Sequence, residues 1–343
     1  MNTQKLISLT GDRPTGPLHI GHLIGSLQER VRIQNTHQSF IMIADSQAYT
    51  DHINNRDKVI NSILQVMEDY LSVGINPNIS TIFLQSAVPE IQELSFYLSN
   101  LVTVARLERI PTIRKEIFEK FKHSNINLSD IPRDIPTGFL TYPISQSADI
   151  LAFDTDIVPV GVDQLPIIEL TNEIAHSFNR IIGQDILKKC RAVANKDCGS
   201  LPGIDGKAKM SKTLGNTINL NSSPDEIKDK VKMMFTDPNH IKVSDPGSVE
   251  GNMVFTYLDH FYNDKEHLHE LKEHYKKGGL GDMKVKKILI DVLIDYFEPI
   301  QKRRNEINKD ELLNILKNGT NIAREKAALK ISLVKKSLGL SIF

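Results

Sequence analysis

One stretch near the amino terminus decides the fold: residues 6–22, which read LISLTGDRPTGPLHIGH. Leu6–Leu9 is apolar and predicts a first β-strand, and Gly11–Pro17 is rich in the turn formers glycine and proline. His19–Gln34 then predicts a helix, because its apolar residues recur every three or four positions. A strand that turns directly into a helix is the first unit of an open α/β sheet. The helix N-terminus at such a turn offers N–H groups and a positive dipole end to phosphate.

His19, Gly21 and His22 stand at the start of that helix. The two histidines are three residues apart, so their side chains leave the same face of the first turn. Gly21 has no side chain, so a flat base could approach the backbone there. Two ring donors beside a triphosphate could stabilise charge that develops at the α-phosphorus. Taken alone, the same residues could also be two solvated histidines at a helix start.

The rest of the first half alternates strands with helices. Further strands are predicted at Phe40–Ala44, Thr81–Leu84, Ile157–Val160 and Arg191–Ala194, and helices at Arg56–Val73, Pro89–Val104, Ser145–Phe153 and Gln164–Phe178. This alternation predicts an α/β fold built on a doubly wound, Rossmann-like parallel sheet. The segment Arg106–Arg133 interrupts the pattern, because it is rich in Lys, Arg, Glu and Asn. We expect it to lie over the sheet or to face a partner.

A second signature follows the last predicted strand, in the glycine- and lysine-rich loop Gly199–Asn216. Residues 209–213 read KMSKT. Two lysines three apart on a loop could close over a polyphosphate and neutralise a leaving pyrophosphate, and the two hydroxyl side chains add donors. An ordinary charged surface loop carries the same residue types. The KMSKT motif therefore indicates a phosphate site only in combination with the first signature.

The two signatures stand in this order, about 190 residues apart, and they resemble the paired HIGH and KMSKS motifs of the class I aminoacyl-tRNA synthetases. Within that class the chain is most similar to the tryptophanyl-tRNA synthetases of bacteria. The likeness extends through MIAD at 42–45, Tyr142-Pro143, ADIL at 148–151, DIVPVG at 156–161 and Asp163-Gln164. It covers essentially the whole catalytic half, whereas the carboxy-terminal half matches in length and helical character.

The resemblance implies sites for ATP, which enters with Mg²⁺, and for L-tryptophan, and it implies no resident metal. The ATP contacts would be Arg13, Pro14, Thr15, Gly21, His22, Gly161, Val162, Asp163, Leu201, Lys209, Met210, Ser211, Lys212 and Thr213. His19, His22, Lys209 and Lys212 would be the catalytic groups, which stabilise charge without acting as nucleophiles. The sequence departs from the family at Thr213, which replaces a serine but keeps the hydroxyl, and at Val162, where a glutamate is common.

The implied tryptophan contacts are Tyr142, Gln146, Asp149 and Gln164, and Asp149 would accept the indole N–H. A buried carboxylate aimed at that N–H is left unpaired by phenylalanine, and sites of this type reject such an analogue by roughly 10⁴–10⁵. Tyr142, Gln146 and Asp149 together also resemble the tyrosine-binding helix of tyrosyl-tRNA synthetases. Tyrosine therefore stays open as the alternative substrate. A non-charging tRNA-binding paralogue and a cofactor-forming nucleotidyltransferase stay open as alternative functions.

After about Ser222 the sequence predicts only helices, at Pro224–Met234, Met253–Phe261, His267–Tyr275, Met283–Asn308 and Asp310–Leu338. Between Lys265 and Phe343, 17 Lys and Arg stand against 11 Asp and Glu, which suits a solvated surface or a phosphate backbone. We divide the chain into a catalytic domain, 1–220, and an all-α domain, 221–343, that would grip the anticodon arm of tRNA(Trp). The family resemblance implies a homodimer, with residues about 89–135 serving the interface or the acceptor arm.

Composition bounds the class of protein. The 343 residues carry 42 Lys and Arg and 42 Asp and Glu, so the chain as a whole is not a polybasic nucleic-acid binder. Two cysteines, Cys190 and Cys198, cannot form a disulfide scaffold or a four-thiolate metal site. There is no run of 18 apolar residues and no signal-peptide pattern at the start. We therefore expect a cytoplasmic enzyme that does not contact membranes.

Overall fold

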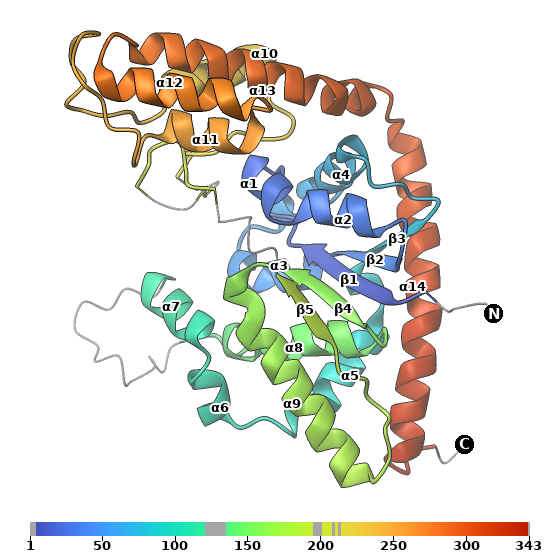
Figure 1. Ribbon diagram of the computed structural model, residues 1–343. Helices are drawn as coiled ribbons and strands as arrows, with labels where there is room; N and C mark the ends of the chain where they lie inside the picture. The colour runs from blue at the N-terminus through green and yellow to red at the C-terminus, as the bar shows by residue number, and fades with distance from the viewer. Residues whose placement is uncertain (1–4, 121–134, 195–200, 208–209, 212–213, 342–343) are drawn as a thin grey trace.

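The computed structural model describes residues 5–120, 135–194, 201–207, 210–211 and 214–341. Its centre is a sheet of five parallel strands in the order β3-β2-β1-β4-β5 (Figure 1). The strands are β1 (Ile7–Asp12), β2 (Gln38–Ile43), β3 (Ser80–Leu84), β4 (Ile157–Val160) and β5 (Arg191–Ala194). The predicted doubly wound parallel sheet is confirmed. The strand order reverses between β1 and β4, where open α/β sheets bind their ligands.

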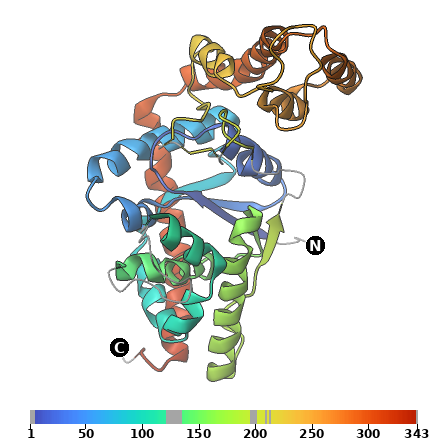
Figure 2. The ribbon, with the colours of Figure 1, turned by 90° about the vertical axis from the view of Figure 1, so that its left-hand side faces the viewer.

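The strands are apolar on both faces because helices cover both faces (Figure 1 and Figure 2). In β2, Phe40 and Met42 belong to the core on one face, and Ile41 and Ile43 to the core on the other. The first core packs against α5 (Pro89–Ser99), α8 (Thr137–Leu151) and α9 (Leu165–Ile182), and the second against α1 (Ile20–His22), the π-helical turn η1 (Leu23–Leu27), α2 (Gln28–Ile33) and α4 (Arg56–Val73).

Several local expectations need correction. The helix predicted at Ser145–Phe153 begins eight residues earlier and ends at Leu151, as α8. The first strand runs to Asp12 rather than to Leu9, because its polar end still pairs with β2. The helix α3 (Asp45–His52) was not predicted, since its sequence DSQAYTDH has no apolar stripe. The predicted helix Pro89–Val104 ends at Ser99 and is followed by α6 (Val104–Glu108) and α7 (Pro111–Lys120).

The segment that interrupts the alternating pattern is also less of a surface insertion than expected. Leu107, Ile110 and Ile113 are fully buried in the core beneath the sheet. These three apolar residues recur every three positions, so they share one face of the segment. That face is enough to bury short helices on one side, although most of the adjacent residues in the sequence are charged. Residues 121–134 of this segment lie outside the described residues.

The carboxy-terminal part consists of α10 (Pro224–Lys232), α11 (Met253–Phe261), α12 (Lys265–Lys277), α13 (Asp282–Asn305) and α14 (Lys309–Ser337). In Figure 1 the first four form a separate layer beyond α1 and α2, whereas α14 runs back along the sheet. Within the described ranges, no helix combines the length and apolar character needed to cross a bilayer. The division near residue 220 remains a prediction.

The helix α14 covers the edge strand β3. A Cβ on Gly319 would lie 2.0 Å from the carbonyl oxygen of Ile82, so only glycine allows this approach. The Thr320 hydroxyl accepts the N–H of Leu84 at 3.1 Å. Ala323 and Ala327 continue the contact into the core on the α5 face of the sheet. The last helix thus protects an edge that would otherwise present unpaired backbone groups.

Candidate active site

The first signature pairs through its main chain with residues 218–220, which follow the second signature. The N–H of Ile20 donates to the carbonyl of Ile218 at 2.9 Å, and the N–H of Leu220 donates to the carbonyl of Leu18 at 2.8 Å. Met210 is buried against Gly21, where an added Cβ would lie 3.0 Å from the Met210 sulfur. The second signature therefore contacts the first at Met210. Lys209, Lys212 and Thr213 lie outside the described residues.

His19 and His22 form a reciprocal cap at the helix start. The N–H of Gly21 donates to Nδ1 of His19 at 3.1 Å, and the N–H of His19 donates to Nδ1 of His22 at 3.2 Å. The two ring centroids are 3.8 Å apart. Because Nδ1 accepts in both neutral rings, the ring proton of each lies on Nε2. The cap therefore orients both histidines as Nε2–H donors, and it satisfies helix N–H groups at the same time.

A largely buried acidic group close to His22 was missed by sequence reasoning. Asp12, the last residue of β1, lies 2.5 Å from Nη1 of Arg30 and accepts the hydroxyl of Tyr70 at 2.8 Å. Burial alone would raise the pKa of Asp12, but the guanidinium of Arg30, the nearby ring of His22 and the hydrogen bond from Tyr70 outweigh it and lower the pKa to about 2. A fixed negative charge thus lies close to His22. Its position at the end of the first strand was the available signal.

Arg13 and Tyr142 lie near each other across the site, although the sequence assigns them to different substrates. Arg13 lies 2.5 Å from the carboxylate of Asp51 and is 43% exposed. Burial raises the pKa of Tyr142, with a further contribution from Glu116, to which its hydroxyl is hydrogen-bonded, and the charge of Arg13 opposes this. A residue expected at the phosphates thus stands beside one expected at the amino acid, as a reaction between the two substrates requires.

The predicted loop Gly161–Asp163 is exposed and follows β4. A Cβ on Gly161 would lie 2.5 Å from Oδ1 of Asp163, so a side chain at this position would displace the exposed carboxylate of Asp163. Gln164 donates to Oδ2 of Asp163 at 3.1 Å and accepts from Nε2 of Gln146 at 3.4 Å. The loop therefore joins the predicted nucleotide residues to two of the predicted amino-acid residues, Gln146 and Gln164.

Asp149 is buried in α8, with 1% of its surface exposed. Nε2 of Gln85 donates to both of its carboxylate oxygens, at 2.8 and 3.0 Å. The other end of the Gln85 amide accepts the N–H of Gln47 at 3.0 Å, so the amide cannot turn over without losing that bond. Burial raises the pKa of Asp149 to about 7, against the lowering effect of Gln85.

Sequence reasoning missed Gln85, although it lies directly after β3, at the same edge of the sheet as the first signature. A polar residue in that position was the available signal, because the carboxyl ends of parallel strands share one edge. It also missed Asn216, which accepts the N–H of Ser211 at 2.8 Å and donates to Asp205 at 3.1 Å. These two bonds tie the described part of the second signature to the core, where Leu201 is buried.

Comparison with known proteins gives one consistent family. The description "tRNA synthetases class I (W and Y)" matches residues 1–298. The chain is 54% identical over 344 residues to a tryptophan–tRNA ligase of Clostridium longisporum, which covers 99% of this chain and 98% of that protein. It is 49% identical over 347 residues to one of Streptococcus pyogenes, with 99% of each covered.

Among solved structures, the chain is similar to the tryptophanyl-tRNA synthetase of Campylobacter jejuni, whose structure was determined with ADP and tryptophan. The TM-score is 0.83 at 32% identity, over 98% of this chain and 100% of that one. This likeness covers the sheet, the flanking helices and the carboxy-terminal helices together. The chain therefore belongs to the class I tRNA synthetases of the tryptophan and tyrosine family.

Proposed function

We propose that this protein is a tryptophan–tRNA ligase. It activates L-tryptophan with ATP to give tryptophanyl-adenylate and pyrophosphate, and then transfers the tryptophanyl group to the terminal ribose of tRNA(Trp). Relatives of that name match the chain over almost its whole length, at 54% and 49% identity. The observation that carries the choice of amino acid is the buried carboxylate of Asp149 with Gln85 held against it.

The nucleotide end of the site comprises residues 13–22, the loop 161–163 and the loop 201–213. In our proposal the Nε2–H donors of His19 and His22 contact the phosphates. Arg13 contacts the phosphates too, either after it breaks its ion pair with Asp51 or while it keeps that ion pair. Lys209 and Lys212 stabilise the pyrophosphate as the tryptophan carboxylate attacks the α-phosphorus and the bond to the leaving oxygen breaks. These groups accelerate the reaction by position and charge, and none needs to form a covalent bond.

The indole end comprises Gln85, Tyr142, Gln146, Asp149 and Gln164. The fixed amide of Gln85 presents donors to Asp149, so the carboxylate is held as an acceptor. An indole N–H can donate a further hydrogen bond to the carboxylate of Asp149, and a phenyl ring cannot. Tyr142 and Gln164 would then hold the α-amino group, near Arg13.

Mg²⁺ enters the proposal as part of the ATP substrate. The described residues contain no group of three or more His, Cys, Asp or Glu side chains that could hold a metal ion. We propose that the phosphate oxygens carry most of the contacts to the cation, which would partly neutralise their charge. The residues at the nucleotide end bind and orient that complex.

The partners of the second step follow from surface character. The excess of basic residues after Lys265 suits the phosphates of a tRNA anticodon arm.

A homodimer would use the face formed by α5 and α6, where Phe96 is 69% exposed and Val104 59% exposed. Large exposed apolar side chains that gather in one patch are typical of a subunit interface. Sedimentation of the wild type and of Phe96→Glu tests this: the variant should be monomeric.

The proposal as a whole is tested by ATP–pyrophosphate exchange with tryptophan, tyrosine and phenylalanine in parallel, followed by charging of tRNA(Trp). We expect exchange with tryptophan alone, and charging that weakens as salt rises because the tRNA contact is ionic. Faster exchange with tyrosine would reassign the substrate. Exchange without charging would mean that the second step is absent, and no exchange at all would overturn the proposal.

A further inference from the structure

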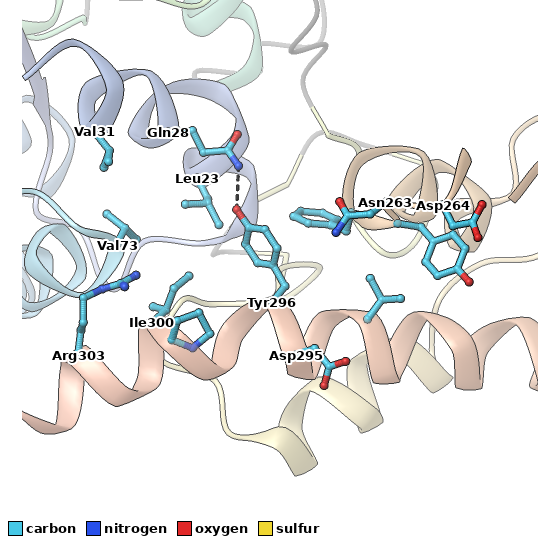
Figure 3. A pocket seen from close by; sticks show the side chains of 14 residues that line it. Leu23, Gln28, Val31, Val73, Asn263, Asp264, Asp295, Tyr296, Ile300 and Arg303 are labelled. Atoms are coloured by element: carbon cyan, nitrogen blue, oxygen red, sulfur yellow. Dashed lines mark hydrogen bonds between the residues drawn. The ribbon is translucent and has the colours of Figure 1, made fainter. Parts of the chain in front are cut away.

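The helix α13 contacts the nucleotide-binding half in two different ways along its length. Towards its middle, a cavity of about 860 Å³ separates it from η1 and α2, as Figure 3 shows. Leu23 and Val31 line the cavity on one side and Tyr296 and Ile300 on the other. A hydrogen bond from Gln28 to the Tyr296 hydroxyl, 2.8 Å long, crosses it. In this part of the interface the cavity separates α13 from η1 and α2, and the Gln28–Tyr296 hydrogen bond links the two sides.

At its end, by contrast, α13 makes a dense ionic contact with α4. The guanidinium of Arg304 lies 3.1 Å from the carboxylate of Glu68 and forms an ion pair with Asp69. It also donates to the hydroxyl of Ser72 at 3.4 Å, and the neighbouring Arg303 donates to the carbonyl of Ser72 at 2.6 Å. Arg304 is 16% exposed and Asp69 1% exposed, so the pair is largely withdrawn from water.

The same buried carboxylate contacts the first signature. Oδ2 of Asp69 accepts the N–H of Leu18 at 2.6 Å, while Oδ1 faces Arg304. Leu18 directly precedes His19, and its carbonyl accepts the N–H of Leu220. One side chain therefore joins the last turn of α13 to the turn that orients both histidines. A buried carboxylate that loses its cation becomes costly, so Asp69 would move or take up a proton if Arg304 were neutral.

We propose that Arg304 is a positioning residue for adenylate formation. It fixes Asp69, which fixes the backbone at Leu18 and so the Nε2–H groups of His19 and His22. Arg304 itself contacts neither substrate. The carboxy-terminal helices thereby take part in the first chemical step, before any tRNA is bound. This inference rests on the proposed function, because it assigns to the histidines their contact with ATP.

The test compares wild type, Arg304→Gln and Arg304→Lys in tryptophan-dependent ATP–pyrophosphate exchange, corrected by active-site titration for the folded fraction. A small misplacement of groups at a reacting centre costs up to about 100-fold. We therefore expect kcat of Arg304→Gln to fall by about 10–100-fold, with the KM for tryptophan unchanged because the indole end is untouched. Arg304→Lys should recover part of kcat, since it retains the positive charge.

A matched control separates positioning from general stability. Arg324 on α14 also forms an ion pair with the catalytic half, at 3.1 Å from Glu90, but it lies away from the first signature. Arg324→Gln should leave kcat at the wild-type level. A kcat of Arg304→Gln equal to that of the control, or a KM for tryptophan that rises in step with the loss of kcat, would overturn the inference.

A second measurement does not depend on catalysis. Hydrogen exchange at the amide of Leu18, followed by NMR or by a peptide that spans residues 14–22, should accelerate in Arg304→Gln and not in Arg324→Gln. Unchanged protection at Leu18 would refute the link through Asp69 even if activity fell. Absence of exchange activity in the wild type would instead overturn the proposed function and leave this structural link intact.

Discussion

At the nucleotide end of the proposed site, segments about 200 residues apart meet through main-chain hydrogen bonds between Leu18–Ile20 and Ile218–Leu220. At the indole end, by contrast, two side chains at the carboxyl ends of a strand and a helix meet in a sealed interior, as Gln85 and Asp149 do. Arg13 remains 43% exposed, whereas Asp149 is 1% exposed.

The difference follows from the chemistry of the two ligands. A triphosphate is large and charged, so backbone N–H groups and several cations on loops can recognise it without being buried. One indole N–H is a small feature, and it discriminates strongly only where water cannot replace it. The nucleotide end should therefore govern the rate of the chemical step, and the indole end the choice of amino acid.

The largest effect is expected from removal of the indole acceptor. In the wild type, kcat/KM for tryptophan should exceed that for phenylalanine by about 10⁴ or more, and Asp149→Ala should abolish most of this preference. The affinity for ATP should stay unchanged. Asp149→Asn is the control, because its amide oxygen can still accept the indole N–H and should retain part of the preference. Equal loss of ATP affinity in Asp149→Ala would contradict the separation of the two ends.

Loss of a phosphate contact should produce the opposite pattern. Lys212→Ala is expected to lower kcat of adenylate formation by about 10²–10³, the usual cost of removing one group that stabilises transition-state charge. The dissociation constant of tryptophan, measured by equilibrium dialysis without ATP, should not change. If tryptophan affinity and kcat fell together, Lys212 would not belong to the nucleotide end.

The pH dependence should be confined to the indole end. The pKa of Asp149 is raised from 3.8 to about 7. In our proposal Asp149 accepts the indole N–H as a carboxylate. Affinity for tryptophan should therefore fall by up to about tenfold per pH unit below pH 7 and level off above it. Affinity for ATP should not follow this profile, and Asp149→Asn should remove it from tryptophan binding. A flat tryptophan profile between pH 6 and 8 would show that the carboxylate is already ionised throughout.

The same raised pKa affects folding with a definite sign. Between pH 4 and 7 the folded protein retains a proton on Asp149 that the unfolded chain has lost, so the free energy of unfolding decreases as pH rises through this window. Thermal unfolding of Asp149→Asn should lack that decrease. If the stability of Asp149→Asn decreased with pH in parallel with that of the wild type, the titrating group would be a residue other than Asp149.

The smallest effect is expected from the residue that supports the acceptor. Gln85→Leu removes the donors that lower the pKa of Asp149, so the midpoint of the tryptophan-binding profile should move to higher pH. At pH 7 the affinity should fall about tenfold or less, within the range of one lost hydrogen bond to a charged group, and raising the pH should restore it. Failure of high pH to restore binding would mean that Gln85 acts by shaping the pocket.

Local pattern was a good guide to the elements. Arg56–Val73, Ile157–Val160 and Arg191–Ala194 were predicted with their observed ends. Their strong periodicity or short apolar runs, bounded by turn formers, leave little choice of structure. The helix α3 was missed because it lies at the carboxyl end of β2 and depends on tertiary contacts rather than on an apolar stripe.

The residue types and their order were sufficient to predict the parallel sheet and the helical carboxy-terminal part, and to propose a site, because periodicity and motif spacing are properties of the chain itself. Only the tertiary structure decided that Gln85 faces Asp149, that Met210 packs on Gly21, and that Arg304 reaches Leu18 through Asp69. Such contacts depend on how helices and strands pack against one another. That packing is set by the combined fit of many side chains, and no single stretch of sequence contains it.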